Sequence, residues 1–470
     1  MDARPRAYCG IDWAEGHHDL AVVNPDGKLI AKRRIADNAQ GFAELIAILA
    51  EAGDTPEQTI PVAIETPRGL MVAALRETGR RIYPINPLAV ARYRERHSVS
   101  RKKSDHVDAM TLANILRTDA HVHRPLPADT ELARAVAVLA RAAQDAIWRR
   151  TKATQELRSL LREFYPGFLE AFAHNGSTNL ASREARAVLR LAPTPAKGAV
   201  VSKARIAAAL RRAGRQRGID ALATTIHRAL RTKHLRHPHT VEEAMGRHAA
   251  ALLATLDTEC NNADELSAAA SEAFGQHPDY AIITSFDGLG DLTGARLLAE
   301  IGDDPTRFAD ARALKAFAGS APVTRASGRS ISVTRRTVKN NRLAAVGFVW
   351  AFAAIPDPAP PSVTTTGDEL EETGTQQRCA TSTTANSASS TTACRPARPT
   401  TRSRPSPSQR PTSWNTRLDS LTRSEVYQRS LAPSGRGDNT PQIIERQGQR
   451  VIPRPAACKP SPSLIKKAPL

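Results

Sequence analysis

Features that would indicate a membrane protein, a secreted protein or a zinc-stabilised protein are missing from this sequence. No uninterrupted apolar run is long enough to cross a bilayer, and the N-terminal MDARPRAY lacks the apolar stretch of a secretory signal. The five cysteines form no CxxC pair and no cluster with histidine, which argues against a zinc site and a disulfide framework. We therefore expect a protein of a reducing cytoplasm with no membrane partner.

Acidic residues are too few to balance the basic ones. The chain has 66 Lys and Arg against 47 Asp and Glu, which gives a formal net charge of +19 at pH 7. An excess of this size favours a polyanionic partner, and nucleic acid is the first candidate. At about 100–200 residues per domain, 470 residues predict two or three domains.

The last 115 residues lack helical or strand periodicity. They hold 16 of the 32 prolines and are rich in Ser, Thr and Arg. Such a composition buries too little apolar surface to offset the entropy of ordering the chain. We predict that residues 356–470 form a disordered tail.

The first 125 residues predict an α/β domain. Strands are expected at 7–14, 17–23, 28–35, 59–65 and 80–86, and helices at 39–52, 69–78 and from Ser104 or Asp105 to Arg117. Three strands in a meander, followed by alternating helices and strands, is the element order of a ribonuclease-H-like (RuvC-like) domain.

The middle of the chain predicts long helices. Over residues 129–164, nine of ten positions in two seven-residue series are apolar, which predicts a coiled-coil helix on the order of 50 Å long. A second copy of the chain and another helix of the same chain are equally good partners for this seam. Residues 197–236 contain eleven Lys and Arg and a single acid, and 240–273 predict a further helix. We divide the chain into 1–125, a coiled-coil and basic region at 126–275, a mainly α domain at 276–355, and the tail.

Four carboxylates are expected to meet at one end of the N-terminal sheet. Asp12 and Glu65 end the first and fourth strands, which are neighbours in a ribonuclease-H-like sheet, and Asp105 and Asp108 share one face of a later helix. Clustered carboxylates repel one another unless a divalent cation compensates them, and oxygen ligands suit Mg²⁺ or Mn²⁺. Two such ions about 4 Å apart can hold the attacking and leaving oxygens of a phosphodiester.

Each carboxylate also has an ordinary structural interpretation. Asp105 suits a helix N-cap, Asp108 suits the positive end of a helix dipole, and Glu65 suits a solvated strand end. Asp12 is the hardest to explain in this way, because it follows an apolar strand and precedes Trp13.

Several stretches taken together resemble the IS110 family of insertion-sequence transposases. They are GIDWA, AIETP, YPINPLAVARYRERHSVSRKKSDHVDA, and the block from FDGLGDLTGARLLAEIGDD to APVTRASG. Members of this family are DEDD recombinases with an N-terminal RuvC-like domain and a C-terminal domain that bears a serine. The resemblance implies a bacterial, nucleoid-associated enzyme that cuts and rejoins insertion-sequence DNA, with a structured RNA as guide.

The resemblance also implies roles for individual residues. The family's four acidic, Mg²⁺-binding residues correspond to Asp12, Glu65, Asp105 and Asp108, and its catalytic serine corresponds best to Ser327. Three other serines lie nearby: Ser320, Ser330 and Ser332. Attack by a serine gives a covalent phosphoserine, which conserves the bond energy for rejoining. Because a helical rod separates the carboxylates from Ser327 in sequence, we expect a homo-oligomer, a dimer or tetramer, in which one subunit supplies the carboxylates and another the serine.

The C-terminal block predicts contacts with a nucleic-acid backbone. Residues 286–303 resemble a helix–hairpin–helix, since Gly288 and Gly290 allow a tight turn and a helix N-terminus follows. Basic residues then occur with no acid between them, and two more precede Asp105. The predicted nucleic-acid-binding residues are Lys102, Lys103, Arg325, Arg329, Arg335, Arg336, Lys339 and Arg342.

The tail departs from the family, whose C-terminal domain continues as helices past residue 350. We hypothesise that a frameshift after about residue 355 replaced these helices and impaired this copy, which the nucleotide sequence would test. Two other functions fit the residues. One is a RuvC-like nuclease that uses water as the nucleophile, and the other is a decayed element protein that binds nucleic acid without catalysis.

Overall fold

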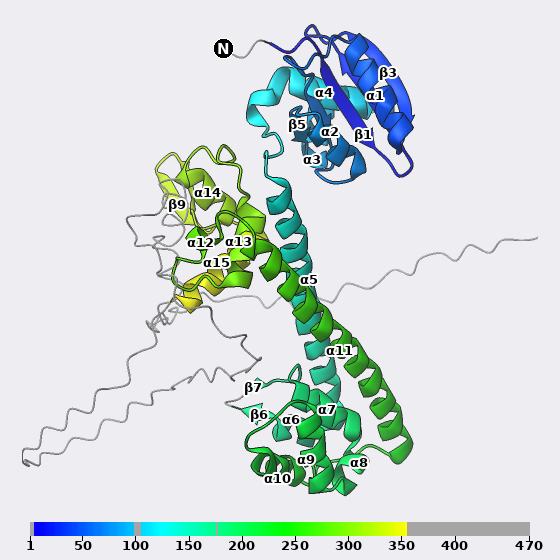
Figure 1. Cartoon of the computed structure of the whole chain (residues 1–470), viewed down its shortest axis with the longest axis vertical. Coiled ribbons are helices and arrows are strands. Elements are labelled where there is room, and N and C mark those ends of the chain that lie inside the picture. The colour runs from blue at the N-terminus through cyan, green and yellow to red at the C-terminus, as the bar shows by residue number, and fades with distance from the viewer. Residues whose placement is uncertain (1–3, 98–104, 175–176, 355–470) are drawn as a thin grey trace, which may run out of the picture.

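The computed structural model describes residues 4–97, 105–174 and 177–354 (Figure 1). The predicted tail, the hypothesised frameshift within it, and Lys102 and Lys103 lie outside the described residues, as does the side chain of Asp105. None of the described helices is both long and apolar enough to cross a membrane.

The N-terminal domain is a five-stranded sheet with helices on both faces. Its strands are β1 (Tyr8–Trp13), β2 (His17–Val23), β3 (Leu29–Ala36), β4 (Val62–Ile64) and β5 (Ile82–Pro84). Its helices are α1 (Ala39–Glu51), α2 (Leu70–Glu77), α3 (Pro87–His97), α4 (Asp105–Asp119) and the 3₁₀ turn η1 (Ala120–Val122). Except for α3 and η1, each element was predicted at nearly these positions.

The strand order is β3-β2-β1-β4-β5. The first three strands form an antiparallel meander, and β1 pairs in parallel with β4, as the sequence predicted. Ile11 and Ile64 face α1 and α2 in one core layer, whereas Tyr8 and Ala63 face α4 in another. The sheet therefore has two buried faces, and its β4–β5 half has the near-continuous apolar character of parallel strands.

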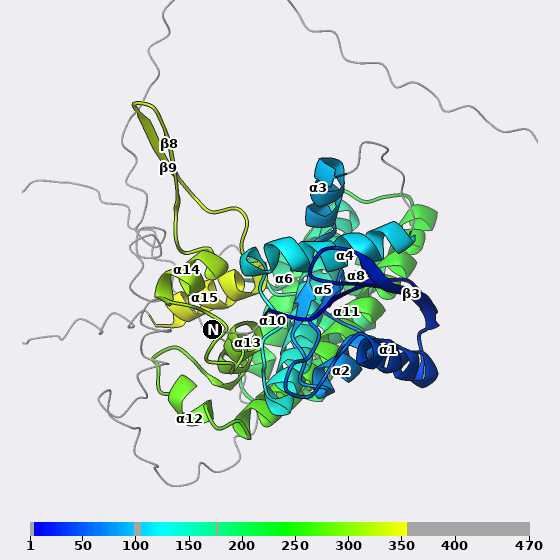
Figure 2. The ribbon, with the colours of Figure 1, turned by 90° about the horizontal axis from the view of Figure 1, so that it is seen from above.

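Two long helices connect the domains. They are α5 (Glu131–Phe164) and α11 (His239–Gly275), which pack along one another within the chain and run in opposite directions (Figures 1 and 2). Val136, Ala143 and Leu157 of the predicted seam are buried. The seam thus has a partner in its own chain, which was one of the two alternatives left open by the sequence.

A helical lobe closes the far end of this pair. It contains α6 (Pro166–Ala171), β6 (Ala173–His174), β7 (Ser177–Thr178), α7 (Arg183–Leu191), α8 (Pro195–Val200), α9 (Lys203–Arg212) and α10 (Ile219–Ala229). Phe168, Ile206 and Leu253 belong to its core. Helix α11 therefore contributes to the lobe as well as to its pair with α5, which we call the helical rod. The chain breaks between α9 and α10 where Gly214 and Gly218 adopt positive φ angles.

The C-terminal domain surrounds the other end of the pair. It contains α12 (Tyr280–Ile283), α13 (Asp291–Ile301), α14 (Ala311–Ala318), β8 (Val323–Ser327), β9 (Ser330–Thr334) and α15 (Asn341–Ala353). Val136 of α5 and Phe274 of α11 share its core with Trp350 of α15. The hairpin β8–β9 was not predicted, because its Arg residues gave the segment the character of a charge run rather than of alternating strands.

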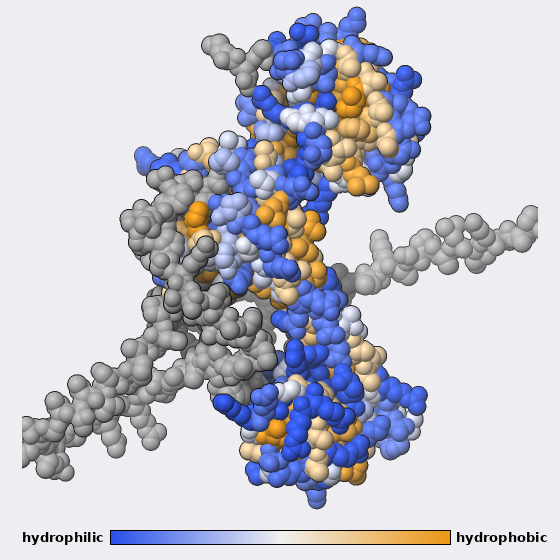
Figure 3. Space-filling view, viewed as in Figure 1, coloured by the Kyte–Doolittle hydropathy of each residue, from blue (hydrophilic) through white to orange (hydrophobic). Residues whose placement is uncertain are grey.

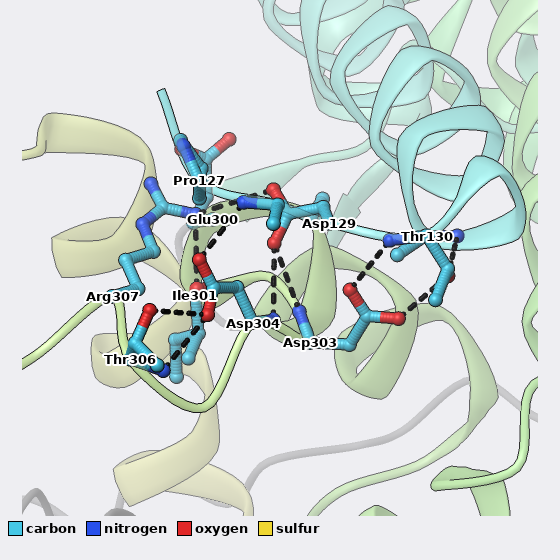
Figure 4. A network of polar contacts seen from close by, with 12 residues as sticks. Pro127, Asp129, Thr130, Glu300, Ile301, Asp303, Asp304, Thr306 and Arg307 are labelled. Atoms are coloured by element: carbon cyan, nitrogen blue, oxygen red, sulfur yellow. Dashed lines mark hydrogen bonds and ion pairs between the residues drawn. The ribbon is translucent and has the colours of Figure 1, made fainter. Parts of the chain in front are cut away.

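A reciprocal polar clamp fastens the C-terminal domain to the chain segment before α5 (Figure 4). The Asp129 carboxylate accepts hydrogen bonds from the backbone N–H groups of Asp303 and Asp304, both 3.2 Å. In return, Asp303 accepts from the Thr130 N–H at 2.9 Å and from its hydroxyl at 2.6 Å, and Asp304 accepts from the Ala128 N–H at 2.8 Å. Segments more than 170 residues apart are thereby held in one geometry.

Candidate active site and nucleic-acid interface

Asp12 and Glu65 lie side by side at one edge of the sheet. Ile11 of β1 is in register with Ile64 of β4, and the two acids are the next residue of each strand. Because parallel strands place their carboxyl ends at the same edge, the two acids follow the paired residues together. Both are half-buried. The predicted neighbourhood of these two carboxylates is therefore present.

Helix α4 approaches this edge with its N-terminal end. A Cβ atom added to Gly10 would lie 2.0 Å from the Ala109 carbonyl oxygen and 2.5 Å from the Ala113 nitrogen, so the helix backbone rests directly on β1. Farther along α4, Arg117 lies against Gly27, near the opposite end of β1. Asp12 shares the Gly10 face of β1, since side chains alternate along a strand. The first turn of α4, which carries Asp105 and Asp108, consequently lies toward Asp12.

Asp108 is buried and ion-paired. Its side chain is 6% exposed, and the guanidinium of Arg94 on α3 contacts its Oδ1 atom. Asp108 is spaced by four residues from Leu112, which packs in the core between α4 and the sheet, so the carboxylate faces inward. A solvated residue that merely favours the helix dipole would not be buried in this way.

A fifth carboxylate, which the sequence reasoning missed, lies next to Asp12. Asp19 of β2 is the register partner of Asp12 and is buried. Arg34 of β3 donates to it from Nη2 at 2.7 Å and from Nε at 3.2 Å. Asp19 is therefore already neutralised by a forked contact across the sheet. Its signal in the sequence was an acidic residue directly before the apolar run at 20–23.

The donor set at this edge suits a hard divalent cation. It consists of carboxylate oxygens at two strand ends and on a helix whose first turn faces them, which is the ligand type that Mg²⁺ and Mn²⁺ prefer. Among the side chains that the structure describes, which exclude that of Asp105, no three His, Cys, Asp or Glu form a ready metal site. A metal would thus require the fourth carboxylate and a rearrangement of the Arg94–Asp108 contact.

Ser327 lies at the tip of the hairpin β8–β9, which projects from the C-terminal domain (Figure 2). Ser327 pairs with Ser330 across a two-residue turn in which Gly328 has a φ of 56°. Cross-strand pairing places Ser327, Arg325 and Ser332 on one face of the ribbon. Ser327 is exposed, whereas Ser320 is buried and donates to the Lys315 carbonyl at 3.3 Å, so Ser320 is inaccessible as a nucleophile.

The predicted basic run divides into exposed and engaged residues. Arg325, Arg329 and Arg335 are exposed on or beside the hairpin. Arg342, by contrast, donates to both oxygens of Asp145 on α5 at 2.7 and 2.9 Å and lies 5.0 Å above the Trp148 ring. Arg336 donates to the Ala321 carbonyl at 3.2 Å, and the stem of Lys339 packs on Gly319. The three hairpin arginines are therefore the best placed of this run to meet a phosphate backbone.

The helical lobe offers a second basic surface. A cleft of about 710 Å³ is lined by Arg183, Arg186, Arg190 and Arg212, together with Asp257 and Asp264 of α11. Asp257 accepts from Arg186 at 2.6 Å and also contacts Arg190. On α10, burial lowers the pKa of His227, with Arg231 and Lys203 adding to the effect. Cations therefore outnumber acids in this lobe and remain close to one another.

Family models match two separate regions of the chain. A transposase model of the DEDD type matches residues 9–166, and a model of the IS116/IS110/IS902 transposase family matches residues 280–360. These ranges contain the carboxylate edge and the hairpin. The chain belongs to the IS110 family of transposases. Its N-terminal domain is a DEDD, ribonuclease-H-like domain. Because its homologues are transposases, the protein is an enzyme that acts on DNA.

Individual relatives agree with this assignment. The chain is 55% identical over 348 residues to a mini-circle putative transposase for IS117 from Streptomyces coelicolor, covering 74% of this chain and 84% of the relative. It is 29% identical over 352 residues to an uncharacterised protein of insertion element IS900 from Mycobacterium paratuberculosis, covering 74% and 85%. A protein of insertion element IS110 from Streptomyces coelicolor is 26% identical over 372 residues, covering 75% and 85%.

Proposed function

We propose that this transposase cuts and rejoins insertion-sequence DNA, with Mg²⁺ held by Asp12, Glu65, Asp105 and Asp108 and with Ser327 as the nucleophile. The observation that supports the metal site best is the register of β1 and β4, which sets Asp12 beside Glu65 beneath the first turn of α4. When bound there, Mg²⁺ supplies charge compensation for the carboxylates and for the phosphate that reacts.

The covalent step uses the exposed hydroxyl at the hairpin tip. The Ser327 hydroxyl gives its proton to solvent and its oxygen attacks phosphorus. The P–O bond to the sugar breaks, and the sugar oxygen takes up a proton from solvent to leave as a hydroxyl. The phosphoserine ester that forms keeps the energy of the broken bond. Attack by a sugar hydroxyl on the phosphoserine then restores the DNA backbone and frees Ser327. The hairpin arginines Arg325 and Arg329 supply charge beside the reacting phosphate.

The proposed transposase also binds a guide RNA and forms a homo-oligomer. The arginine-lined cleft of the helical lobe has no aromatic side chain on which bases could stack, so its contacts would be with the phosphate backbone. This surface suits an RNA whose sequence is read by base pairing and whose shape is held by the protein. Contacts of this kind are sensitive to salt.

Two variants test the proposed chemistry. Asp12→Ala should abolish Mg²⁺-dependent cleavage of element-end DNA and leave DNA affinity nearly unchanged, because one carboxylate adds little to a strongly basic protein. Ser327→Ala should eliminate the covalent protein–DNA adduct, because alanine has no oxygen to attack phosphorus. Ser330→Ala, on the same ribbon face, is the matched control. Undiminished cleavage by Asp12→Ala, or an adduct from Ser327→Ala, would contradict the assignment.

The second candidate function is DNA hydrolysis without rejoining. It is favoured by the position of Ser327, whose hairpin strands contact chiefly each other and project from the C-terminal domain (Figure 2). In that case water attacks phosphorus and Ser327→Ala cleaves at the wild-type rate. A protein that binds nucleic acid with no metal-dependent cleavage in any variant would instead be a decayed element protein.

A further inference from the structure

Arg94 contacts Asp108, one of the carboxylates that the proposed metal ion would have to bind. It lies on α3, which precedes the carboxylate helix α4, and it contacts Asp108 Oδ1. The Arg94 side chain is 20% exposed, and the Asp108 side chain 6%. The carboxylate that is proposed to coordinate a cation is therefore already in contact with a cationic side chain.

The Arg94–Asp108 contact leaves hydrogen-bonding atoms of both side chains unsatisfied. Neither the Nε atom of Arg94 nor the Oδ1 atom of Asp108 completes a hydrogen bond within the part of the chain that the structure describes. A buried ion pair stabilises a fold only when its hydrogen bonds are satisfied as well. Arg34 on Asp19 shows the contrast, since its Nε and Nη2 atoms both donate to the carboxylate.

The buried Asp108 carboxylate nevertheless needs a nearby cation to compensate its negative charge. Burying Asp108 with no counter-charge would be costly, and Asp12 and Glu65 add negative charge at the same edge. A guanidinium supplies one positive charge, whereas a divalent ion supplies two and suits carboxylate oxygens better. Both cations compensate the same carboxylate charge and repel each other, so the presence of one weakens the binding of the other.

We propose that Arg94 is an exchangeable counter-ion of the metal site: it binds Asp108 in the metal-free protein, is displaced when a divalent cation binds, and then binds a phosphate oxygen of the DNA. This inference rests on the proposed metal site. A guanidinium released at the edge of the carboxylate cluster carries a planar set of donors that suits phosphate. Metal loading and binding of the DNA backbone are thereby coupled through one side chain.

Metal affinity gives the first test. Mn²⁺ binding to the full chain is measured by electron paramagnetic resonance for the wild type, Arg94→Ala and the control Arg96→Ala. Arg96 is exposed, lies two residues along the same helix and lines a separate cavity of about 450 Å³. Arg94→Ala should bind Mn²⁺ on the order of tenfold more tightly, because a competing charge is gone, whereas Arg96→Ala should bind as the wild type does. Equal or weaker binding by Arg94→Ala would overturn the exchange.

A second readout tests the phosphate contact. Ca²⁺ should raise the affinity of the wild type for element-end DNA by a larger factor than it raises that of Arg94→Ala, and an equal increase in both would refute the phosphate contact.

Should Arg94→Ala be unstable, Arg94→Gln removes the charge and keeps a planar polar group. Asp108→Asn separates the two proposals, because loss of Mn²⁺ binding there supports the metal site whatever Arg94 does. Absence of Mn²⁺ binding in the wild type and in Arg94→Ala would refute both.

Discussion

Gly10 shows how a single residue positions the carboxylates. The backbone of α4 lies where a side chain on Gly10 would be, with Ala109 and Ala113 as the contacting residues. The separation of α4 from β1 therefore depends on the absence of a Cβ atom at this position. Since Asp12 is two residues farther along the same face, displacement of α4 would move Asp108 away from Asp12.

We predict that Gly10→Ala destabilises the N-terminal domain by on the order of 1–3 kcal/mol, the usual cost of an overpacked core, and weakens metal-dependent cleavage. Thermal unfolding followed by circular dichroism measures the first effect. Gly275→Ala is the matched control, because no atom lies within 4 Å of the added Cβ. Equal unfolding temperatures for the two variants would show that α4 can move aside without cost.

The sequence identified the proposed metal-binding carboxylates but not Arg94, which contacts Asp108, nor Asp19, the register partner of Asp12. Asp12 and Glu65 follow short apolar strands, so their position was evident from the alternation of the chain and from the order of the elements. Arg94 lies in a helix whose charged residues gave no apolar periodicity, although Pro87 at its start is a helix signal. Asp19 was missed because its partner is supplied by a neighbouring strand, and such pairs depend on register.

The loop after α13 holds the C-terminal domain to the segment that precedes α5. The turn at Gly302 has a φ of 72°, and a Cβ atom there would lie 2.2 Å from an oxygen of the Asp129 carboxylate. Asp303 in this loop also contacts the buried His277 at 3.3 Å. The pKa of Asp303 is lowered overall: burial alone would raise it, but the Thr130 hydrogen bonds and His277 favour the carboxylate more strongly.

This lowered pKa predicts a dependence of stability on pH. A carboxyl group whose pKa is lower in the folded state stabilises the fold above its unfolded pKa of about 3.9, and the stabilisation is lost as the pH falls through the folded value. Asp303→Asn should therefore cost on the order of 1.5–3 kcal/mol at pH 7, the scale of hydrogen bonds to a charged group, and lose less stability than the wild type on acidification. Unfolding curves between pH 3 and pH 8 measure this, with the exposed Asp220→Asn as control. Parallel curves for the wild type and Asp303→Asn would contradict the role of the clamp.

Long helices were predicted well and the hairpin was not. The seven-residue recurrence in α5 is a local pattern that a partner helix reinforces, so its position needed no tertiary information. The hairpin β8–β9 gains little from packing, since Ile331 is 71% and Val333 65% exposed. Its alternation of Thr, Ser and Val was visible, but Ser327-Gly328-Arg329-Ser330 had to be interpreted as a two-residue turn rather than as part of a basic run.

At the scale of the whole molecule, basic surfaces occur at both ends of the helical rod. The rod itself is mainly hydrophilic on the face shown in Figure 3. We predict that the affinity for nucleic acid falls linearly in log K against log salt, because binding releases counterions from phosphates. Segments 197–236 and 325–342 should dominate this slope. Fluorescence anisotropy across a salt series measures it, and an affinity that hardly changes with salt would contradict phosphate contact.

The hairpin arginines can be separated from net charge within the same experiment. Replacing Arg325, Arg329 and Arg335 by Ala should reduce the magnitude of the slope by about 2–3, because each phosphate that the protein no longer neutralises lowers it by about 0.9. Lys28 precedes β3, and Lys32 and Arg33 lie on it; all three are exposed. Replacing them changes the net charge equally and should alter the slope much less. Equal changes in the two triple variants would indicate that binding follows total charge and not the hairpin.

The path of the chain alters the argument for a shared active site. The sequence suggested that a rod separates the carboxylates from Ser327, but α11 runs back along α5, so both domains lie at the same end of the rod (Figure 1). The clamp then fixes the C-terminal domain next to the start of α5, and the hairpin that carries Ser327 extends away from that domain (Figure 2). Separation by the rod is thus not the reason to expect two subunits, whereas the projection of the hairpin is.

We therefore predict that the carboxylates of one subunit act with Ser327 of another. Asp12→Ala and Ser327→Ala proteins should each be inactive in strand exchange, and mixing them should restore part of the activity, because a mixed oligomer can join an intact carboxylate cluster to an intact serine. With random assortment into dimers, about half of the molecules are mixed and each has one complete site, so recovery should approach a quarter of the wild-type rate. The double variant mixed with wild type serves as the control for dilution of subunits. If the mixture stays inactive although sedimentation shows that the two variants co-assemble, Ser327 acts in its own subunit, and the hairpin must fold toward the carboxylates of the same chain.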